Sequence, residues 1–250
     1  MPKIRILTDA LLASIGFILL CVSQLFIWFI ILPGVTHDTP FRHTYYLRAD
    51  TRGITGARDV SQWTYFFICG PDNRDCGPSH PAIPFGFAWD SNARNVPPGL
   101  GGSHGSHTTS FHYFYMWRFG WVFLLMTLFF EVLAFFTSIL ACCGRLGAAL
   151  AFVVSSIALF FYTLAVSIIT ATFCQARNRF HDAGRSAKIG PWAFGFLWGS
   201  YVALLIAVIL FALGIRSSPT FNFKRRQSSR EPTGSRGRSY DGRRVKEEYS

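Results

Sequence analysis

The sequence predicts an α-helical membrane protein in which four transmembrane helices carry one small β-containing domain. Three observations indicate this fold class. Half of the 250 residues are hydrophobic and only 15% are charged, whereas about a quarter of a soluble domain is charged. The charged residues leave four long apolar gaps. Between the first two gaps lies a long polar segment that contains Trp63, Cys69 and Cys76.

The four apolar stretches are each long enough to cross a bilayer. Charge-free stretches run from Ala10 to His37, from Leu146 to Ala176 and from Ile189 to Ile215, and Phe119 to Gly144 contains one charge, Glu131. Each exceeds the ~20 apolar residues that span the hydrocarbon core, where only a helix satisfies its own backbone polar groups. We therefore expect transmembrane helices over residues 9–32, 119–142, 147–174 and 190–215.

The segments between these helices complete the predicted organisation. The first helix is expected to stay uncleaved, because its apolar run is longer than that of a signal peptide and no small-x-small site follows it. The other predicted segments are an N-terminus (1–8), a loop domain (33–118), a hairpin (143–146), a second loop (175–189) and a disordered basic tail (216–250).

Lysine and arginine indicate the orientation. Lys3 and Arg5 precede the first helix, Arg145 lies between the second and third, and ten basic residues follow the fourth. Because basic residues near helix ends mark the cytosolic side, both termini are expected in the cytosol. The four basic residues of the 175–189 loop oppose this orientation. The cysteines of the first loop favour it, since disulfides persist in oxidising compartments.

Cys69 and Cys76 are the strongest local signal in the chain. The runs from Tyr45 to Leu47 and from Trp63 to Cys69 are rich in aromatic and β-branched residues and predict strands. We expect a Cys69–Cys76 disulfide that clamps a β-containing outer domain, with Trp63 packed in its core. The alternative is two free thiols. A zinc site is not expected, because no second cysteine pair accompanies the first.

Two polar residues lie deep in the predicted spans. Gln24 is thirteen residues from the cytosolic end of its helix and Glu131 is twelve from the cytosolic end of the next. At ~1.5 Å per residue both lie at similar depth. We expect a Gln24–Glu131 hydrogen bond that joins the helices, because a carboxylate in hydrocarbon needs a partner. The alternative is a proton or ion pathway through Glu131.

Two further features concern the membrane. Gly195 and Gly199 form a GxxxG pattern, which allows close helix packing. Packing within the bundle is favoured over a homo-oligomer. Cys142 and Cys143 lie beside Arg145 at the expected cytosolic edge and are candidates for S-palmitoylation. The alternative is that these cysteines are simply two small residues at a helix end.

The seven histidines all fall in the two predicted outer loops. Because imidazole titrates near neutral pH, an outward-facing pH response is one interpretation of these histidines. His104, His107 and His112 are near enough in sequence to suggest a metal, but the surrounding Gly/Ser run offers no rigid scaffold. Solvated loop histidines are the favoured interpretation, and no metal or cofactor is expected.

The tail carries ten basic residues against four acidic ones. Beside a bilayer such a segment attracts anionic lipids, and Lys224, Arg225 and Arg226 are the predicted lipid-binding residues. Arg225 and Arg226 also precede Ser228 in the manner of a basophilic kinase site, where phosphate would weaken the attraction to lipid. Nucleic acid is not expected as a partner of a segment tethered to a membrane.

The chain resembles the claudin superfamily in its four spans, in Trp63 ahead of a cysteine pair, and in the short second hairpin. Within that superfamily it is similar to the fungal Sur-seven/PalI family of plasma-membrane proteins, over roughly residues 5–215. The stretch from Ala176 to Tyr201 carries this likeness, through Arg177-Asn178, Phe180, Gly184, Gly190, Phe194 and Trp198. The animal claudin Gly-Leu-Trp motif is missing before Cys69, so a tight-junction pore function is not carried over.

The resemblance implies a claudin-like bundle in the plasma membrane, in eisosome patches. It implies roles in membrane-domain organisation, cell-wall integrity and endocytosis, with other membrane or cortical proteins as partners. A PalI-like auxiliary subunit for pH signalling, a channel or a wall synthase is one alternative, and a transporter using Glu131 is another. No nucleophile–base constellation, phosphate loop or pair of catalytic carboxylates is evident, so an enzyme is not expected.

Overall fold

Four long helices dominate the part of the chain that the structure describes. The computed structural model describes residues 2–36, 38–141 and 145–217. The long helices are α1 (Pro2–Ile31), α3 (Phe111–Ala141), α4 (Arg145–Asp182) and α5 (Pro191–Ser217). Each contains a segment long and apolar enough to span a membrane: Leu11–Ile31, Phe111–Ile139, Ala149–Asp182 and Pro191–Ile215. The predicted fold class is confirmed.

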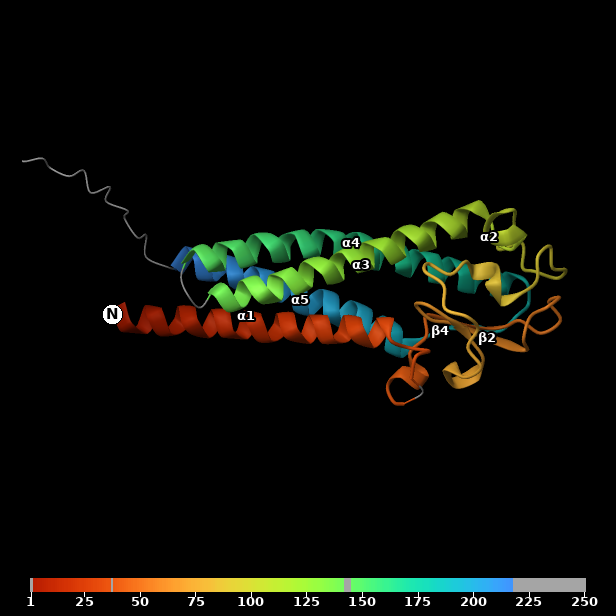
Figure 1. The fold of residues 1–250 in the computed structure, drawn as a ribbon, viewed down its shortest axis with the longest axis horizontal. Coiled ribbons are helices and arrows are strands. Elements are labelled where there is room, and N and C mark those ends of the chain that lie inside the picture. Colours follow the sequence, from red (N-terminus) through yellow and green to blue (C-terminus); the bar gives the residue numbers. More distant parts are fainter. Residues whose placement is uncertain (1, 37, 142–144, 218–250) are drawn as a thin grey trace, which may run out of the picture. The chain divides into compact units, whose positions relative to one another are not determined.

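The helices pack as two antiparallel pairs that meet through α4 and α5. The most extensive contacts join α3 to α4 and α1 to α5. Figure 1 shows the four helices running together, with the sheet at the end opposite the N-terminus. Large apolar side chains point away from the bundle on every long helix, such as Ile18, Phe129, Phe160 and Ile209. A helix that is apolar all round suits a membrane, where lipid covers these outer faces.

Three helices extend further than their apolar composition predicts. α1 begins at Pro2 instead of 9, so residues 2–8, predicted as a separate N-terminus, are helical. α3 begins at Phe111 instead of 119, and α4 ends at Asp182 instead of 174. A 38-residue helix is ~57 Å long, well beyond a hydrocarbon core of ~30 Å. The charge at Arg177 ends the apolar stretch but not the helix. Residues 175–182, predicted as loop, are therefore helical.

Gly184 terminates α4. Its φ of +71° is the left-handed conformation that glycine adopts without strain. The N–H of Gly184 donates to the carbonyl of His181 at 2.9 Å, and the N–H of Arg185 donates to that of Phe180 at 2.9 Å. This is the Schellman arrangement, which satisfies the last helical carbonyls. It turns the chain sharply towards α5.

A small antiparallel sheet lies beyond the ends of α1 and α5 and beside the projecting end of α4 (Figure 1). Its order is β3 (Ile68–Cys69), β2 (Val60–Trp63), β1 (Leu47–Asp50) and β4 (Ala187–Ile189). The second loop thus supplies an edge strand, β4. We call residues 33–110 and 183–190 together the head. It also contains the short helices η1 (Phe41–His43), η2 (Pro71–Asn73), η3 (Phe85–Ala88) and α2 (His104–His107).

The predicted strands are placed differently in the structure. β1 begins only at Leu47, which pairs with Trp63 on one side and Ile189 on the other. The run from Trp63 to Cys69 is not one strand but the end of β2, a turn and the short β3. Thr64 closes that turn, because its hydroxyl donates to the Phe67 carbonyl at 3.0 Å and accepts from the Phe67 N–H at 3.2 Å.

Candidate functional site

Trp63 lies at the centre of the head core. Its side chain is 1% exposed, and its indole N–H donates to the carbonyl of Phe85 at 3.1 Å. The ring packs against Phe85 of η3 at 5.8 Å and Phe180 of α4 at 5.9 Å between centroids. Trp63 therefore joins the sheet to the projecting end of α4.

Tyr46 fixes the head to the bundle. Its ring stacks on Phe173 of α4 at 4.7 Å and meets Trp117 of α3 edge-on at 5.5 Å. Phe194 of α5 lies edge-on at 6.1 Å. Aromatic pairs at these separations stabilise beyond the area they bury. One residue next to β1 thus contacts three of the four long helices.

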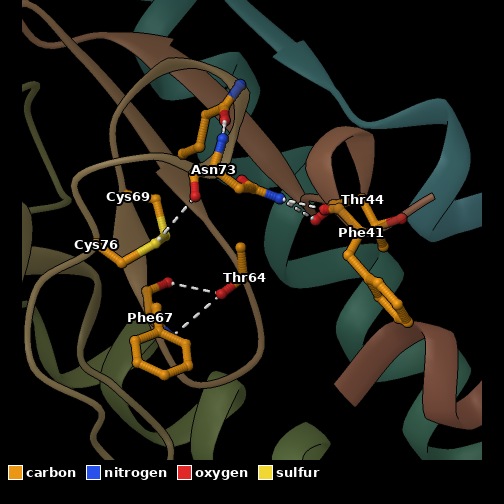
Figure 2. Close-up of a disulfide and its surroundings, with 8 residues drawn as sticks. Phe41, Thr44, Thr64, Phe67, Cys69, Asn73 and Cys76 are labelled. Carbon is orange, nitrogen blue, oxygen red and sulfur yellow. Dashed lines mark hydrogen bonds between the residues drawn. A yellow bond between two sulfur atoms is a disulfide. The ribbon is translucent and has the colours of Figure 1, made fainter. Parts of the chain in front are cut away.

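The Cys69–Cys76 disulfide is present, as predicted, and encloses a buried asparagine. Asn73 is fully buried, and its amide donates to the carbonyls of Phe41 and Thr44, both at 2.8 Å. Its backbone N–H donates to the Gln62 side chain at 2.9 Å. Figure 2 shows Asn73 reaching from the disulfide loop to η1. The loop therefore holds the chain that leaves α1 against β2.

An ion pair reinforces this junction. Arg42 of η1 lies 3.0 Å from the Asp72 carboxylate of η2. The hydrogen bond from Arg42 holds the pKa of Asp72 below its usual value. Because both side chains are about two-fifths exposed, water screens the pair and its contribution to stability is small. The hydrogen bonds of Asn73 therefore stabilise this junction more than the ion pair does.

Replacing Asn73 by alanine is expected to loosen the head. The change strands the buried Thr44 carbonyl, whereas the Phe41 carbonyl keeps its bond from the Thr44 N–H. This costs about 1–3 kcal/mol of head stability, and alanine tolerates the φ of +50° less well than asparagine. The measurement is the rate at which the purified chain's head is cleaved in limited proteolysis. Asn92→Ala is the matched control, since Asn92 has a φ of +54° but an exposed side chain. Equal cleavage of both variants would contradict the assignment.

Arg185 ties the second loop to the first. Its guanidinium donates to the carbonyl of Arg52 at 2.7 Å and to that of Asn95 at 3.2 Å. Gly190 completes the junction, because a Cβ there would collide with the carbonyl of Tyr45. Residues 183–190, within the stretch from Ala176 to Tyr201, therefore fold as part of the head between the end of α4 and the start of α5. Phe180, Gly184 and Gly190 each have a packing or backbone role in it.

A buried polar cluster joins three helices inside the bundle. The Ser23 hydroxyl of α1 donates to the Glu131 carboxyl oxygen Oε1 of α3 at 2.7 Å. The Ser200 hydroxyl of α5 donates to the Ser23 carbonyl at 2.8 Å, and the two hydroxyl oxygens are 2.9 Å apart. All three side chains are fully buried. Within the described residues, the second oxygen of Glu131 has no hydrogen-bond partner.

This cluster corrects the predicted Gln24–Glu131 pair. The depth along the helices was predicted correctly, but the partner of Glu131 is Ser23, the residue before Gln24. Consecutive helical residues differ by about 100° in direction, so Ser23 points inward while Gln24 is only partly buried. Depth alone does not specify the rotation of a helix.

The two glycines of the GxxxG pattern have different surroundings. Gly199 lies against α1, where a Cβ would be 3.3 Å from the Phe26 ring. Gly195 is exposed, with nothing within 4 Å of a Cβ built on it. Gly195 lines a groove of about 380 Å³ with Phe26, Pro191, Trp192 and Phe196. Of the two glycines, Gly199 packs against α1 within the bundle and Gly195 does not.

The histidines considered for metal binding have separate surroundings. The ring of His104 packs among Phe111, Phe114 and Tyr115. His112 Nε2 lies 2.9 Å from the amide oxygen of Gln175. No group of three or more metal-ligating side chains converges within the described residues. Cys142, Cys143, Lys224, Arg225, Arg226 and Ser228 lie outside those residues.

Sequence reasoning missed several residues that build these sites. Ser23 and Ser200 escaped notice because serine is common in apolar helices and carries no periodic signal. The position of Asn73 between two cysteines was a weak signal, and so was the position of Arg185 directly after a glycine. β4 had none, because its three residues become a strand only by pairing with β1.

The fold and its junctions define a class of protein: a four-span membrane protein whose head is built from both loops on one side of the bundle. A family model described as SUR7/PalI family matches residues 12–210, which include nearly all of the described bundle and head. The chain belongs to the SUR7/PalI family.

Relatives in yeasts agree with this assignment. The chain is 33% identical over 199 residues to the SUR7 family protein FMP45 of Saccharomyces cerevisiae, covering 77% of this chain and 62% of that protein. It is 31% identical over 203 residues to protein SUR7 of Candida albicans, covering 78% and 71%. It is 29% identical over 193 residues to an uncharacterized plasma membrane protein of Saccharomyces cerevisiae, covering 75% and 62%. The match therefore spans about three fifths of the first and third of these relatives.

Proposed function

We propose that this Sur7-type membrane protein is a non-catalytic organiser of plasma-membrane domains of the eisosome type. In this role it supports domain organisation, cell-wall integrity and endocytosis. One observation carries the proposal: the head is fixed to α3, α4 and α5 through Tyr46. A contact made by the head is thereby coupled to the position of the membrane helices, as an organiser requires.

The head is proposed to face the outside, with both termini in the cytosol. The Cys69–Cys76 disulfide supports this orientation, because such bonds persist in oxidising compartments. Lys3, Arg5 and the basic residues beyond α5 support it through the positive-inside rule. Anionic lipids would then meet the tail at Lys224, Arg225 and Arg226, under control of phosphate at Ser228. Cys142 and Cys143 would add acyl chains at the same face.

The Glu131 cluster favours an organiser over a transporter. Glu131 bonds to Ser23, which in turn bonds to Ser200, so the group links α3, α1 and α5. Its side chain is fully buried. Hydrogen bonds between membrane helices stabilise their packing modestly. A structural link between helices explains the placement of Glu131 without a transport pathway.

Fluorescent tagging of the full chain in fungal cells tests the proposed function. An organiser should form stable cortical patches whose fluorescence recovers slowly after bleaching. Diffuse surface signal or an endosomal signal would contradict the proposal and favour an auxiliary subunit. Co-purification adds a second readout, because an auxiliary subunit should bring a stoichiometric partner.

A further inference from the structure

A cavity of about 450 Å³ lies in the head, and Trp63 is not among its lining residues. Its walls come from β2, the disulfide region, the segment around η3 and the end of α2. The volume falls in the range of about 300–1,000 Å³ that is typical of small-molecule sites. No role described above uses this cavity.

Three ionisable side chains line the cavity without an internal partner. They are Arg58, His80 and Asp90. Among the described residues, none of the three side chains forms a hydrogen bond or an ion pair. Arg58 and Asp90 are exposed and His80 is partly exposed. Their donors and acceptors are therefore free for a ligand.

The chain makes room for these groups. Gly56 lines the cavity, and a Cβ there would collide with the Asp90 carboxylate. A Cβ built on Gly70 would lie 3.9 Å from Arg58 Nη1, which places this guanidinium over the disulfide loop. The cavity thus presents a cation, Arg58, and an anion, Asp90, from different segments, and their charges balance.

The far wall is held in place by hydrogen bonds. The Trp89 indole donates to the carbonyl of Thr108 at 3.0 Å, and the Ser91 hydroxyl donates to that of Ser106 at 2.7 Å. Trp89 and Ile83 are buried and form an apolar surface. The cavity is therefore preformed, as small-molecule sites commonly are.

An aromatic ring completes the lining. Phe87 is 38% exposed, and His80 meets its ring edge-on with centroids 5.4 Å apart. The face of an aromatic ring carries negative potential, which attracts the polarised C–H groups of a sugar ring. Free planar donors and acceptors beside such a ring suit a ligand rich in hydroxyl groups.

We propose that this cavity binds a neutral saccharide, with Arg58, Asp90 and His80 on its hydroxyl groups and Phe87 against its ring. The balanced charge argues against phosphate, because Asp90 would repel it. Exposure argues against a zwitterion such as an amino acid, because water screens exposed ion pairs. This inference rests on the proposed function in one respect only, namely that the head faces the outside of the cell, where it would meet saccharides.

Binding to the purified full chain tests this proposal independently of orientation or patch formation. The probes are maltotriose, cellotriose and laminaritriose, neutral glucose trisaccharides that differ in linkage. Ligand-detected NMR is recorded in a detergent without a sugar headgroup, with inorganic phosphate and glycine as comparison probes. At least one trisaccharide is expected to bind saturably with a Kd of roughly 1 mM, and phosphate and glycine are not.

Variants locate the site. Arg58→Ala and Asp90→Ala are each expected to weaken saccharide binding about tenfold, since each removes a charge-assisted hydrogen bond. Arg94→Ala and Asp182→Ala are matched controls, because these exposed residues lie outside the cavity lining. A thermal melt verifies that every variant is folded. Failure of all three trisaccharides to bind would overturn the proposal. Binding of phosphate or glycine in place of the trisaccharides would also overturn it. Equal saccharide binding by all folded variants would do the same.

Discussion

Replacing Trp63 by alanine is expected to unfold the head while the four helices remain inserted. The substitution removes a large, fully buried side chain and its hydrogen bond to Phe85. Losing a buried aromatic residue of this size typically costs about 3–5 kcal/mol. The head has a small core, so this loss should be decisive. Limited proteolysis of the purified chain should cut within residues 33–110 far faster than in the wild type.

Trp198→Ala is the matched control for this prediction. Trp198 is 44% exposed on α5, on a surface that faces lipid, so its loss should leave the head resistant to protease. Trp63→Phe should restore part of the resistance, because it keeps contact with Phe85 and Phe180 while losing the N–H. If Trp63→Ala and Trp198→Ala gave the same cleavage pattern, Trp63 would not be the centre of the core.

Replacing Glu131 by lysine is expected to disrupt the bundle. Glu131 is fully buried between helices, and a lysine deep in a membrane helix costs roughly 2.5–3.5 kcal/mol on insertion scales. The chain should therefore accumulate poorly and melt at a lower temperature in detergent. Glu131→Gln should remain close to the wild type, because the amide oxygen still accepts the Ser23 hydroxyl.

Ser23 and Gln24 separate the observed cluster from the pair expected by depth. Ser23→Ala removes the donor to Glu131 and should lower the melting temperature, by an amount equivalent to about 1 kcal/mol. Gln24→Ala should change it less, since Gln24 is only partly buried. A larger drop in melting temperature for Gln24→Ala than for Ser23→Ala would show that Gln24 is the partner of Glu131. If Glu131→Lys left accumulation and melting temperature unchanged, the cluster would have no structural role.

The membrane fold was predictable because long charge-free stretches have few alternatives in a bilayer. The same signal does not locate helix ends, since α4 continues through Arg177 to Asp182. The disulfide was predictable from two cysteines in a polar segment. The Asn73 bonds inside it were not, because their acceptors lie about thirty residues away.

Tertiary contacts decide what the sequence left open. The partner of Glu131 depends on the rotation of α1, and a shift of one residue exchanges Ser23 for Gln24. The cavity in the head draws Arg58, His80 and Asp90 from separate segments. No local pattern brings these residues together. Their meeting follows from the turn after Trp63 and the packing of η3.

Glycosylation mapping tests the central claim, a head on the outer face of a four-span protein, most directly. Gly53→Asn creates an acceptor site with Thr55, at an exposed glycine with φ of +75° and no atom within 4 Å of an added Cβ. Thr233→Asn creates the matched site with Ser235 in the tail. We expect a glycosidase-sensitive mass increase for Gly53→Asn alone. Modification of Thr233→Asn, or none of Gly53→Asn, would contradict the account.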